Sequence, residues 1–65
     1  MKLTEMQIKA AKLIKSRNDG GLGARMPYYE LIKSADELIH LGLSERRGAG
    51  RWLTDAGRAA LKDTP

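Results

Sequence analysis

Three arginines in the C-terminal third of the chain have the side chains best suited to binding chemistry. Arg46 and Arg47 precede the stretch Gly48-Ala49-Gly50, and Arg51 follows it. Guanidinium groups form paired hydrogen bonds with phosphates, and glycines permit the positive φ angles of a tight turn. The pattern therefore predicts a basic hairpin that is suited to a polyanionic partner.

Charge is unevenly distributed along the 65 residues, whose net charge is +4. Residues 1–25 hold six Lys or Arg against two acids, and residues 26–42 hold one Lys against three acids. A basic balance favours a polyanionic partner but says nothing about the fold. The acidic middle segment bears on how such a partner could be bound.

Several classes of function are disfavoured by composition. The chain has no cysteine and one histidine, which argues against disulfides and a metal site. We also expect no cofactor. Without paired catalytic side chains we expect no enzyme and no small-molecule substrate. No apolar run approaches the roughly 18 residues of a membrane span, and no signal core is present. We therefore expect one cytoplasmic domain, residues 1–65, with no membrane partner.

Two amphipathic helices are predicted in the first two thirds. Met1–Asn18 has Thr4 as a candidate N-cap and Gln7 at the capping-box position, followed by a glycine-rich loop, Asn18–Met26. The apolar arc of this first helix contains Leu3, Met6, Ala10, Leu13 and Ile14.

The second predicted helix, Tyr28–Leu41, has Pro27 in its first turn. Two short helices, Tyr28–Lys33 and Ser34–Leu41, remain an alternative. Its apolar arc contains Tyr28, Leu31, Ile32, Ala35, Leu38 and Ile39.

The remaining third is predicted to be a hairpin followed by a short helix. Gly42 is a candidate left-handed C-cap, and Thr54 is a candidate N-cap. Gly57 lies inside the last helix, where glycine costs about 1 kcal/mol relative to alanine, so we expect it to permit close backbone packing. Trp52 is predicted to pack the hairpin onto the domain, although an exposed binding anchor is the alternative. The predicted elements are strands Leu43–Arg47 and Arg51–Thr54 and helix Asp55–Leu61.

These residues resemble a known family. The segments Leu38–Leu43, Glu45–Arg47 and Trp52–Arg58 are similar to the winged-helix signature of small bacterial and phage regulators, the MarR and PadR types among them. The resemblance implies a compact α+β winged helix with the order α-α-β-β-α. The chain departs from that pattern because Asp19–Met26 is too short and glycine-rich for the usual middle helix, which must be shortened or missing.

The resemblance also implies double-stranded DNA as the partner and regulation of transcription as the function. The helix ending at Leu41 would enter the major groove, and the hairpin, or wing, would lie along the phosphate backbone. The candidate contacts are Arg46, Arg47, Arg51, Lys33, Tyr29, His40 and Arg25.

The second helix also supports a different class of function. Its outer face carries Glu30, Asp36 and Glu37, whose carboxylates would be repelled by phosphates. The alternative is therefore a winged-helix module that binds a protein partner or a second copy of itself and does not read DNA.

Overall fold

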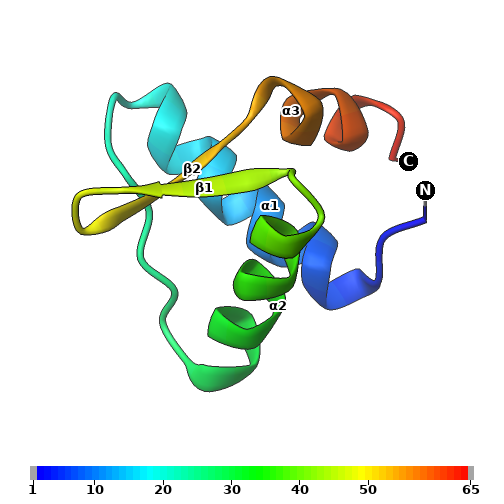
Figure 1. The fold of residues 1–65 in the computed structure, drawn as a ribbon, viewed down its shortest axis with the longest axis horizontal. Helices are drawn as coiled ribbons and strands as arrows, with labels where there is room; N and C mark the ends of the chain where they lie inside the picture. Colours follow the sequence, from blue (N-terminus) through cyan, green and yellow to red (C-terminus); the bar gives the residue numbers. More distant parts are fainter. Residues whose placement is uncertain (1, 65) are drawn as a thin grey trace.

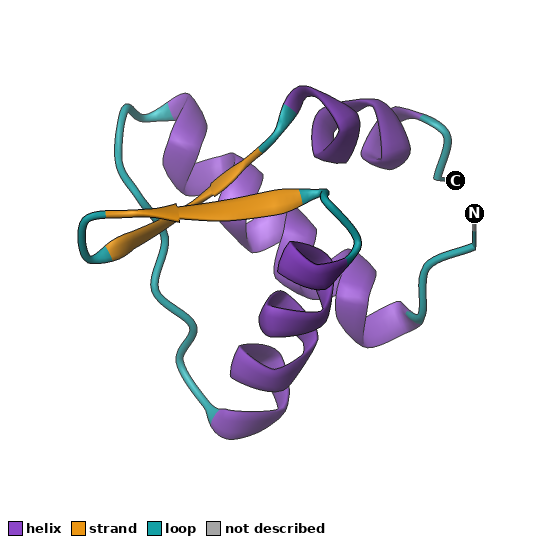
Figure 2. Ribbon diagram, in the orientation of Figure 1, coloured by secondary structure: helices purple, strands orange, loops and turns teal. Residues whose placement is uncertain are grey.

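The computed structural model describes residues 2–64, which form three helices and one antiparallel hairpin (Figure 1; Figure 2). The elements are α1 (Glu5–Asp19), α2 (Tyr29–His40), β1 (Ser44–Arg47), β2 (Gly50–Leu53) and α3 (Asp55–Lys62). This order confirms the predicted α+β class, α-α-β-β-α. Residues 20–28 contain no helix, so the middle helix is missing.

The start of α1 is set by its capping box. The Gln7 backbone N–H donates to Thr4 Oγ1 at 3.1 Å, and the Thr4 N–H donates to Gln7 Oε1 at 3.0 Å. The predicted cap is confirmed, but the prediction that residues 2–4 are helical is wrong because Thr4 has an extended backbone. Met1 lies outside the described residues. Ala10, Ala11 and Ile14 form the fully buried face.

α2 is one continuous helix, as predicted, and the alternative of two short helices is wrong. Its C-terminus is closed by hydrogen bonds from the Leu43 N–H to Leu38 O at 2.9 Å and from the Gly42 N–H to Ile39 O at 3.0 Å. Gly42 has φ +76°, as this C-terminal motif requires. The predicted left-handed glycine is therefore confirmed.

The first turn of α2 differs from the prediction. Tyr28 is the N-cap with an extended backbone, so Pro27 precedes the helix instead of lying in its first turn. Tyr28 is therefore outside the helical phase and is 40% exposed, which makes its assignment to the core wrong. Its hydroxyl accepts a hydrogen bond from Lys9 Nζ at 3.1 Å. Ile32, also expected in the core, is 38% exposed.

The hairpin pairs Ser44 with Leu53 and Arg47 with Gly50, leaving Gly48 and Ala49 as a two-residue turn. Gly48 has φ +61°, and Ala49 does not have a positive φ, which is the pattern of a type II′ turn. Both predicted strands are confirmed, with bounds shifted by one residue.

The loop before α2 adds a bridge to the outer edge of β2. The Ala24 N–H donates to Arg51 O at 2.9 Å, and the Arg51 N–H donates to Ala24 O at 3.0 Å. Gly23 makes this approach possible, because a Cβ there would lie 2.7 Å from Gly50 Cα and 2.9 Å from Trp52 Nε1. The Trp52 side chain therefore lies close to the loop at Gly23 and is half-buried. It is not among the described side chains that pack against the core, so its predicted role in packing the hairpin onto the domain stays a prediction.

The last helix, α3, begins at the predicted cap: the Gly57 N–H donates to Thr54 Oγ1 at 3.0 Å. A Cβ on Gly57 would overlap the carbonyl oxygen of Leu43. The predicted close backbone packing at Gly57 is therefore confirmed. Ala60 and Leu61 pack against the core, as expected.

The core lies where α1 crosses behind α2 and the hairpin in the view of Figure 1. α3 lies at the upper right in Figure 2, away from the hairpin turn, and packs against α1. The arrangement leaves the hairpin turn and residues 20–28 together at one end of the molecule. The buried apolar side chains are Ala10, Ala11, Ile14, Ala24, Leu31, Ala35, Leu38, Leu43 and Leu53.

Asp19, the last residue of α1, forms an ion pair with α3. Its carboxylate lies 2.9 Å from Lys15 Nζ and 3.1 Å from Arg58 Nη1. The hydrogen bonds from Lys15 and then Arg58 hold the pKa of Asp19 below its ordinary value of 3.8. A carboxyl group whose pKa is lowered by folding stabilises the fold above its unfolded pKa, and this stabilisation is lost as the pH falls through the folded pKa.

We therefore expect Asp19→Asn to melt at a lower temperature than the wild type at neutral pH. The two melting temperatures should converge as the pH falls below the ordinary value of 3.8 and through the lowered pKa of Asp19. Because the three side chains are half-exposed, the difference should be small. Thermal unfolding followed by circular dichroism across this range measures it, and a gap that persists in acid would contradict the assignment.

Candidate nucleic-acid interface

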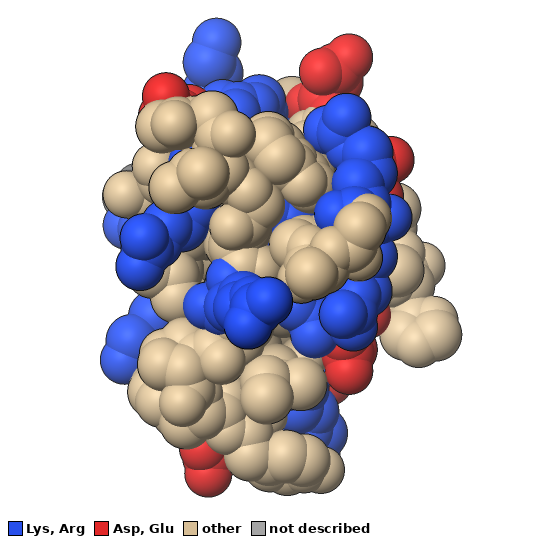
Figure 3. All heavy atoms as spheres, turned by 90° about the vertical axis from the view of Figure 1, so that its left-hand side faces the viewer, with Lys and Arg blue, Asp and Glu red and all other residues tan. Residues whose placement is uncertain are grey.

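The end of the molecule that contains the hairpin turn and residues 20–28 is strongly basic. Figure 3 looks onto this end, which lies at the left of Figure 1. Lys and Arg side chains extend across the face, while Asp and Glu appear mainly at its margins. The face therefore has the charge that a polyanionic partner would favour.

Arg46 and Arg47, both on β1, are exposed. Neighbouring residues of a strand point to opposite faces, so their side chains diverge. The Arg47 Cζ lies over the Trp52 ring, 4.7 Å from the ring centroid, and the Arg47 Nε lies 3.1 Å from Glu45 Oε1. It remains 64% exposed, which leaves hydrogen-bonding capacity for a ligand. Arg46 lies on the α2 side of the hairpin and forms no ion pair within residues 2–64.

Arg51 was expected beside these two as a free surface arginine, and that expectation is wrong. Its side chain is only 7% exposed, and its Nη2 lies 2.9 Å from Asp36 Oδ1 on α2. Arg51 shares the inward face of β2 with Leu53, because alternate residues of a strand point the same way. The alternation could have revealed this from the sequence: Leu53 had to be buried, and Arg51 is in phase with it.

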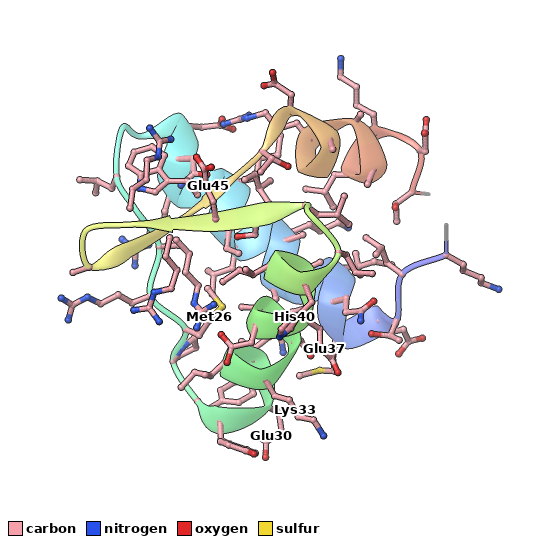
Figure 4. All side chains as sticks on the ribbon, in the orientation of Figure 1. Met26, Glu30, Lys33, Glu37, His40 and Glu45 are labelled. Carbon is pink, nitrogen blue, oxygen red and sulfur yellow. The ribbon has the colours of Figure 1, made fainter. Side chains whose placement is uncertain are left out.

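The three α2 candidates share one exposed face. Tyr29, Lys33 and His40 fall within roughly 40° of one another at 100° per residue, and Tyr29 is 71% exposed. Figure 4 shows Lys33, Glu37 and His40 along α2. The structure therefore brings the predicted α2 contacts together on a surface that faces solvent.

Two of the three acids on α2 have partners inside the protein. Asp36 binds Arg51, and Glu37 Oε1 accepts a hydrogen bond from Gln7 Nε2 at 3.2 Å. From the sequence, all three carboxylates on the outer face were expected to repel phosphates. Their repulsion of a polyanion is weaker than the sequence implied, because one negative charge is balanced by a buried guanidinium.

A hollow separates the hairpin from α2. It has a volume of about 390 Å³ and is lined by Arg25, Arg46 and Arg51 together with the apolar side chains of Ala24, Met26 and Ile32. Arg25, the remaining sequence candidate, is exposed at its mouth. Met26, labelled in Figure 4, lies between the loop and α2. The hollow was not foreseen because the bridge between Ala24 and β2 creates it.

Comparison with known families, with curated proteins and with solved structures found no match. In the described part of the chain, residues 2–64, no three His, Asp or Glu side chains are grouped so that they could hold a metal ion. No helix among these residues is long and apolar enough to cross a membrane.

Proposed function

We propose that this chain is a small winged-helix protein that binds double-stranded DNA and regulates transcription in the cytoplasm. The observation that carries the proposal is the pair of exposed arginines on β1, Arg46 and Arg47, beside a face on which Lys and Arg predominate. Arginine forks match phosphate geometry, so the hairpin would act as the wing and lie along the DNA backbone.

In the same proposal α2 enters the major groove. Lys33 and His40 would supply hydrogen-bond donors to base edges or phosphates, and Tyr29 would contact the adjacent backbone. Asp36 is already paired with Arg51, and this ion pair joins α2 to the wing. The pair would hold the two binding elements at a fixed separation, which a middle helix normally helps to do.

The test is duplex DNA of random sequence, titrated at about 50 and about 200 mM salt. Binding should weaken steeply with salt, because each neutralised phosphate contributes about 0.9 to the slope of log K against log salt concentration. The double variant Arg46→Ala with Arg47→Ala should lose most of the binding and lower the slope by about 2. Fluorescence anisotropy of labelled duplex measures both quantities.

A matched control removes two positive charges elsewhere. Lys12 on α1 and Lys62 on α3 are exposed and form no ion pair in the described part of the chain. The double variant Lys12→Ala with Lys62→Ala should retain most of the binding. Equal losses in the two double variants would show that only net charge matters, which would refute the wing.

A second candidate function has its own observation. Tyr28, Tyr29, Ile32 and Leu41 are large apolar side chains exposed on or beside α2. Such side chains suit a protein partner or a second copy of this chain. If duplex DNA causes no amide shifts in an NMR titration while raising the protein concentration shifts α2 alone, self-association replaces DNA binding as the function.

A further inference from the structure

The hollow between α2, the hairpin and residues 24–26 has two chemically different kinds of wall. Arg25, Arg46 and Arg51 supply guanidinium groups, and Ala24, Met26 and Ile32 supply apolar surface. Its volume of about 390 Å³ lies at the small end of the range for small-molecule pockets. A ligand matching both walls would carry an anionic group on a carbon skeleton.

Positive charge exceeds negative charge around this hollow. Asp36 is the carboxylate partner of Arg51, while Arg25 and Arg46 form no ion pair within residues 2–64. Two guanidinium groups are therefore available to a ligand. Both side chains are exposed, so we expect their attraction for an anion to weaken as salt is added.

Arg51 supplies a second, independent indication of a ligand. Its side chain is 93% buried, yet Nη1 has no hydrogen-bond partner in the described structure. A buried N–H donor without an acceptor costs about 1–3 kcal/mol. An oxygen brought into the hollow by a ligand could satisfy this donor after a small movement of the guanidinium.

We propose that the hollow binds a phosphate ester, with Arg25 and Arg46 holding the phosphoryl oxygens from the mouth and Arg51 from the inner wall. The ester's carbon part lies against Met26 and Ile32. The phosphate can come from the backbone of duplex DNA or from a free phosphorylated molecule. The phosphate site can therefore exist even if the chain does not bind DNA, although the two proposals share Arg46.

The first experiment uses phenyl phosphate and inorganic phosphate as probes. Amide signals of Ala24, Met26 and Ala49, which also lines the hollow, report occupancy in an NMR titration. Phenyl phosphate should shift these amides and bind more tightly than inorganic phosphate, because its ring covers the apolar wall. Equal binding of the two probes, or shifts spread over the whole basic face, would overturn the proposal.

Matched arginine variants locate the contacts. Arg25→Ala and Arg46→Ala should each weaken phenyl phosphate binding about tenfold, since each removes a charge-assisted hydrogen bond. Arg47→Ala removes the same charge from the same strand but outside the hollow, and it should change the affinity less than about twofold. If Arg47→Ala costs as much as Arg46→Ala, the hollow is not the site.

The contribution of Arg51 is tested without removing its buried side chain. Asp36→Asn takes away the carboxylate that competes for the guanidinium and should tighten phenyl phosphate binding by about threefold or more. Asp63→Asn makes the same chemical change at the exposed residue that follows α3, and it controls for net charge. Equal effects of the two substitutions would remove Arg51 from the site and overturn the proposal.

A final titration distinguishes the two sources of phosphate. If short duplex DNA displaces phenyl phosphate, and its affinity falls equally in the Arg25→Ala and Arg46→Ala variants, the occupant of the hollow is a backbone phosphate. If phenyl phosphate stays bound when DNA is added, whether DNA binds elsewhere on the protein or does not bind at all, the occupant of the hollow is a free phosphate ester. In the second case DNA binding can fail while the hollow is confirmed. If neither source shifts the amides of Ala24, Met26 and Ala49, the proposal is wrong.

Discussion

Gly57→Ala is expected to leave most of the chain unfolded at room temperature. An added Cβ would overlap the Leu43 carbonyl oxygen and lie 3.2 Å from Leu53 Cδ2. The Leu43 carbonyl cannot easily move, because it accepts the Thr54 N–H at 3.1 Å while the Leu43 N–H donates to Leu38 O. We expect a loss of about 4 kcal/mol in the free energy of unfolding. A single core of this size supplies only about 3–5 kcal/mol.

Urea unfolding followed by circular dichroism measures this loss. Gly20→Ala is the matched control, because its Cβ would meet only Arg17 O, at 3.4 Å, and its φ is −85°. That variant should stay within about 0.5 kcal/mol of the wild type. Alanine favours a helix over glycine by about 1 kcal/mol, so a large loss at Gly57 can only come from the steric overlap. A folded, fully stable Gly57→Ala protein would contradict the described packing of α3.

Asn18→Ala is expected to cost about 3 kcal/mol, because one side chain joins three parts of the fold. The Asn18 Nδ2 donates to Leu22 O at 2.9 Å and to Arg51 O at 3.2 Å, while Oδ1 accepts the Leu53 N–H at 2.9 Å. Two of these bonds are buried. Truncation leaves the Leu53 N–H in the interior without its acceptor and releases the loop from α1.

Two further variants make the result specific. Asn18→Asp preserves the shape but replaces the donor with an oxygen facing two carbonyl oxygens, so at neutral pH it should destabilise the protein at least as much as alanine. Ser16→Ala changes an exposed α1 residue and should have an effect below about 0.5 kcal/mol. Urea unfolding of the three variants tests the ranking. Asn18→Asp with wild-type stability would refute the role of the donor.

Local sequence signals predicted most of the secondary structure. The capping box at Thr4, the left-handed Gly42 and the cap at Thr54 each depend on a few neighbouring residues, and all three are confirmed. The close packing at Gly57 followed from the energetic cost of glycine inside a helix. Such features are readable because the interacting groups are close in sequence.

The starts of both long helices were misplaced locally, at residues 2–4 and at Tyr28. The burial of polar side chains was missed because it depends on contacts between distant parts of the chain. Asn18 had been assigned to the junction of the first helix and the glycine-rich loop, and its burial was not predicted. It is buried because β2 passes beside the end of α1. Arg51 had been assigned to the surface, but it is buried against Asp36. A helix or strand period alone does not show which polar residues a distant segment will cover.

Only part of the candidate interface could be predicted from the sequence. Arg25, Arg46, Arg47 and the α2 candidates are exposed as expected. The helical period identifies the outer face of α2, whereas Arg25 lies in a loop and Arg46 and Arg47 lie beside the hairpin turn. The hollow depends on the Ala24 bridge, which no local pattern signals. The roles of these residues in DNA binding stay predictions.

The Ala24 bridge also affects how the protein resists aggregation. Because Ala24 occupies the outer edge of β2, β1 is the side of the hairpin left open in the described structure. An open strand edge can recruit a strand from another molecule, and charged side chains discourage this. Glu45, Arg46 and Arg47 are three of the four residues of β1. The arginines offered to a ligand would therefore also keep copies of the chain from joining edge to edge.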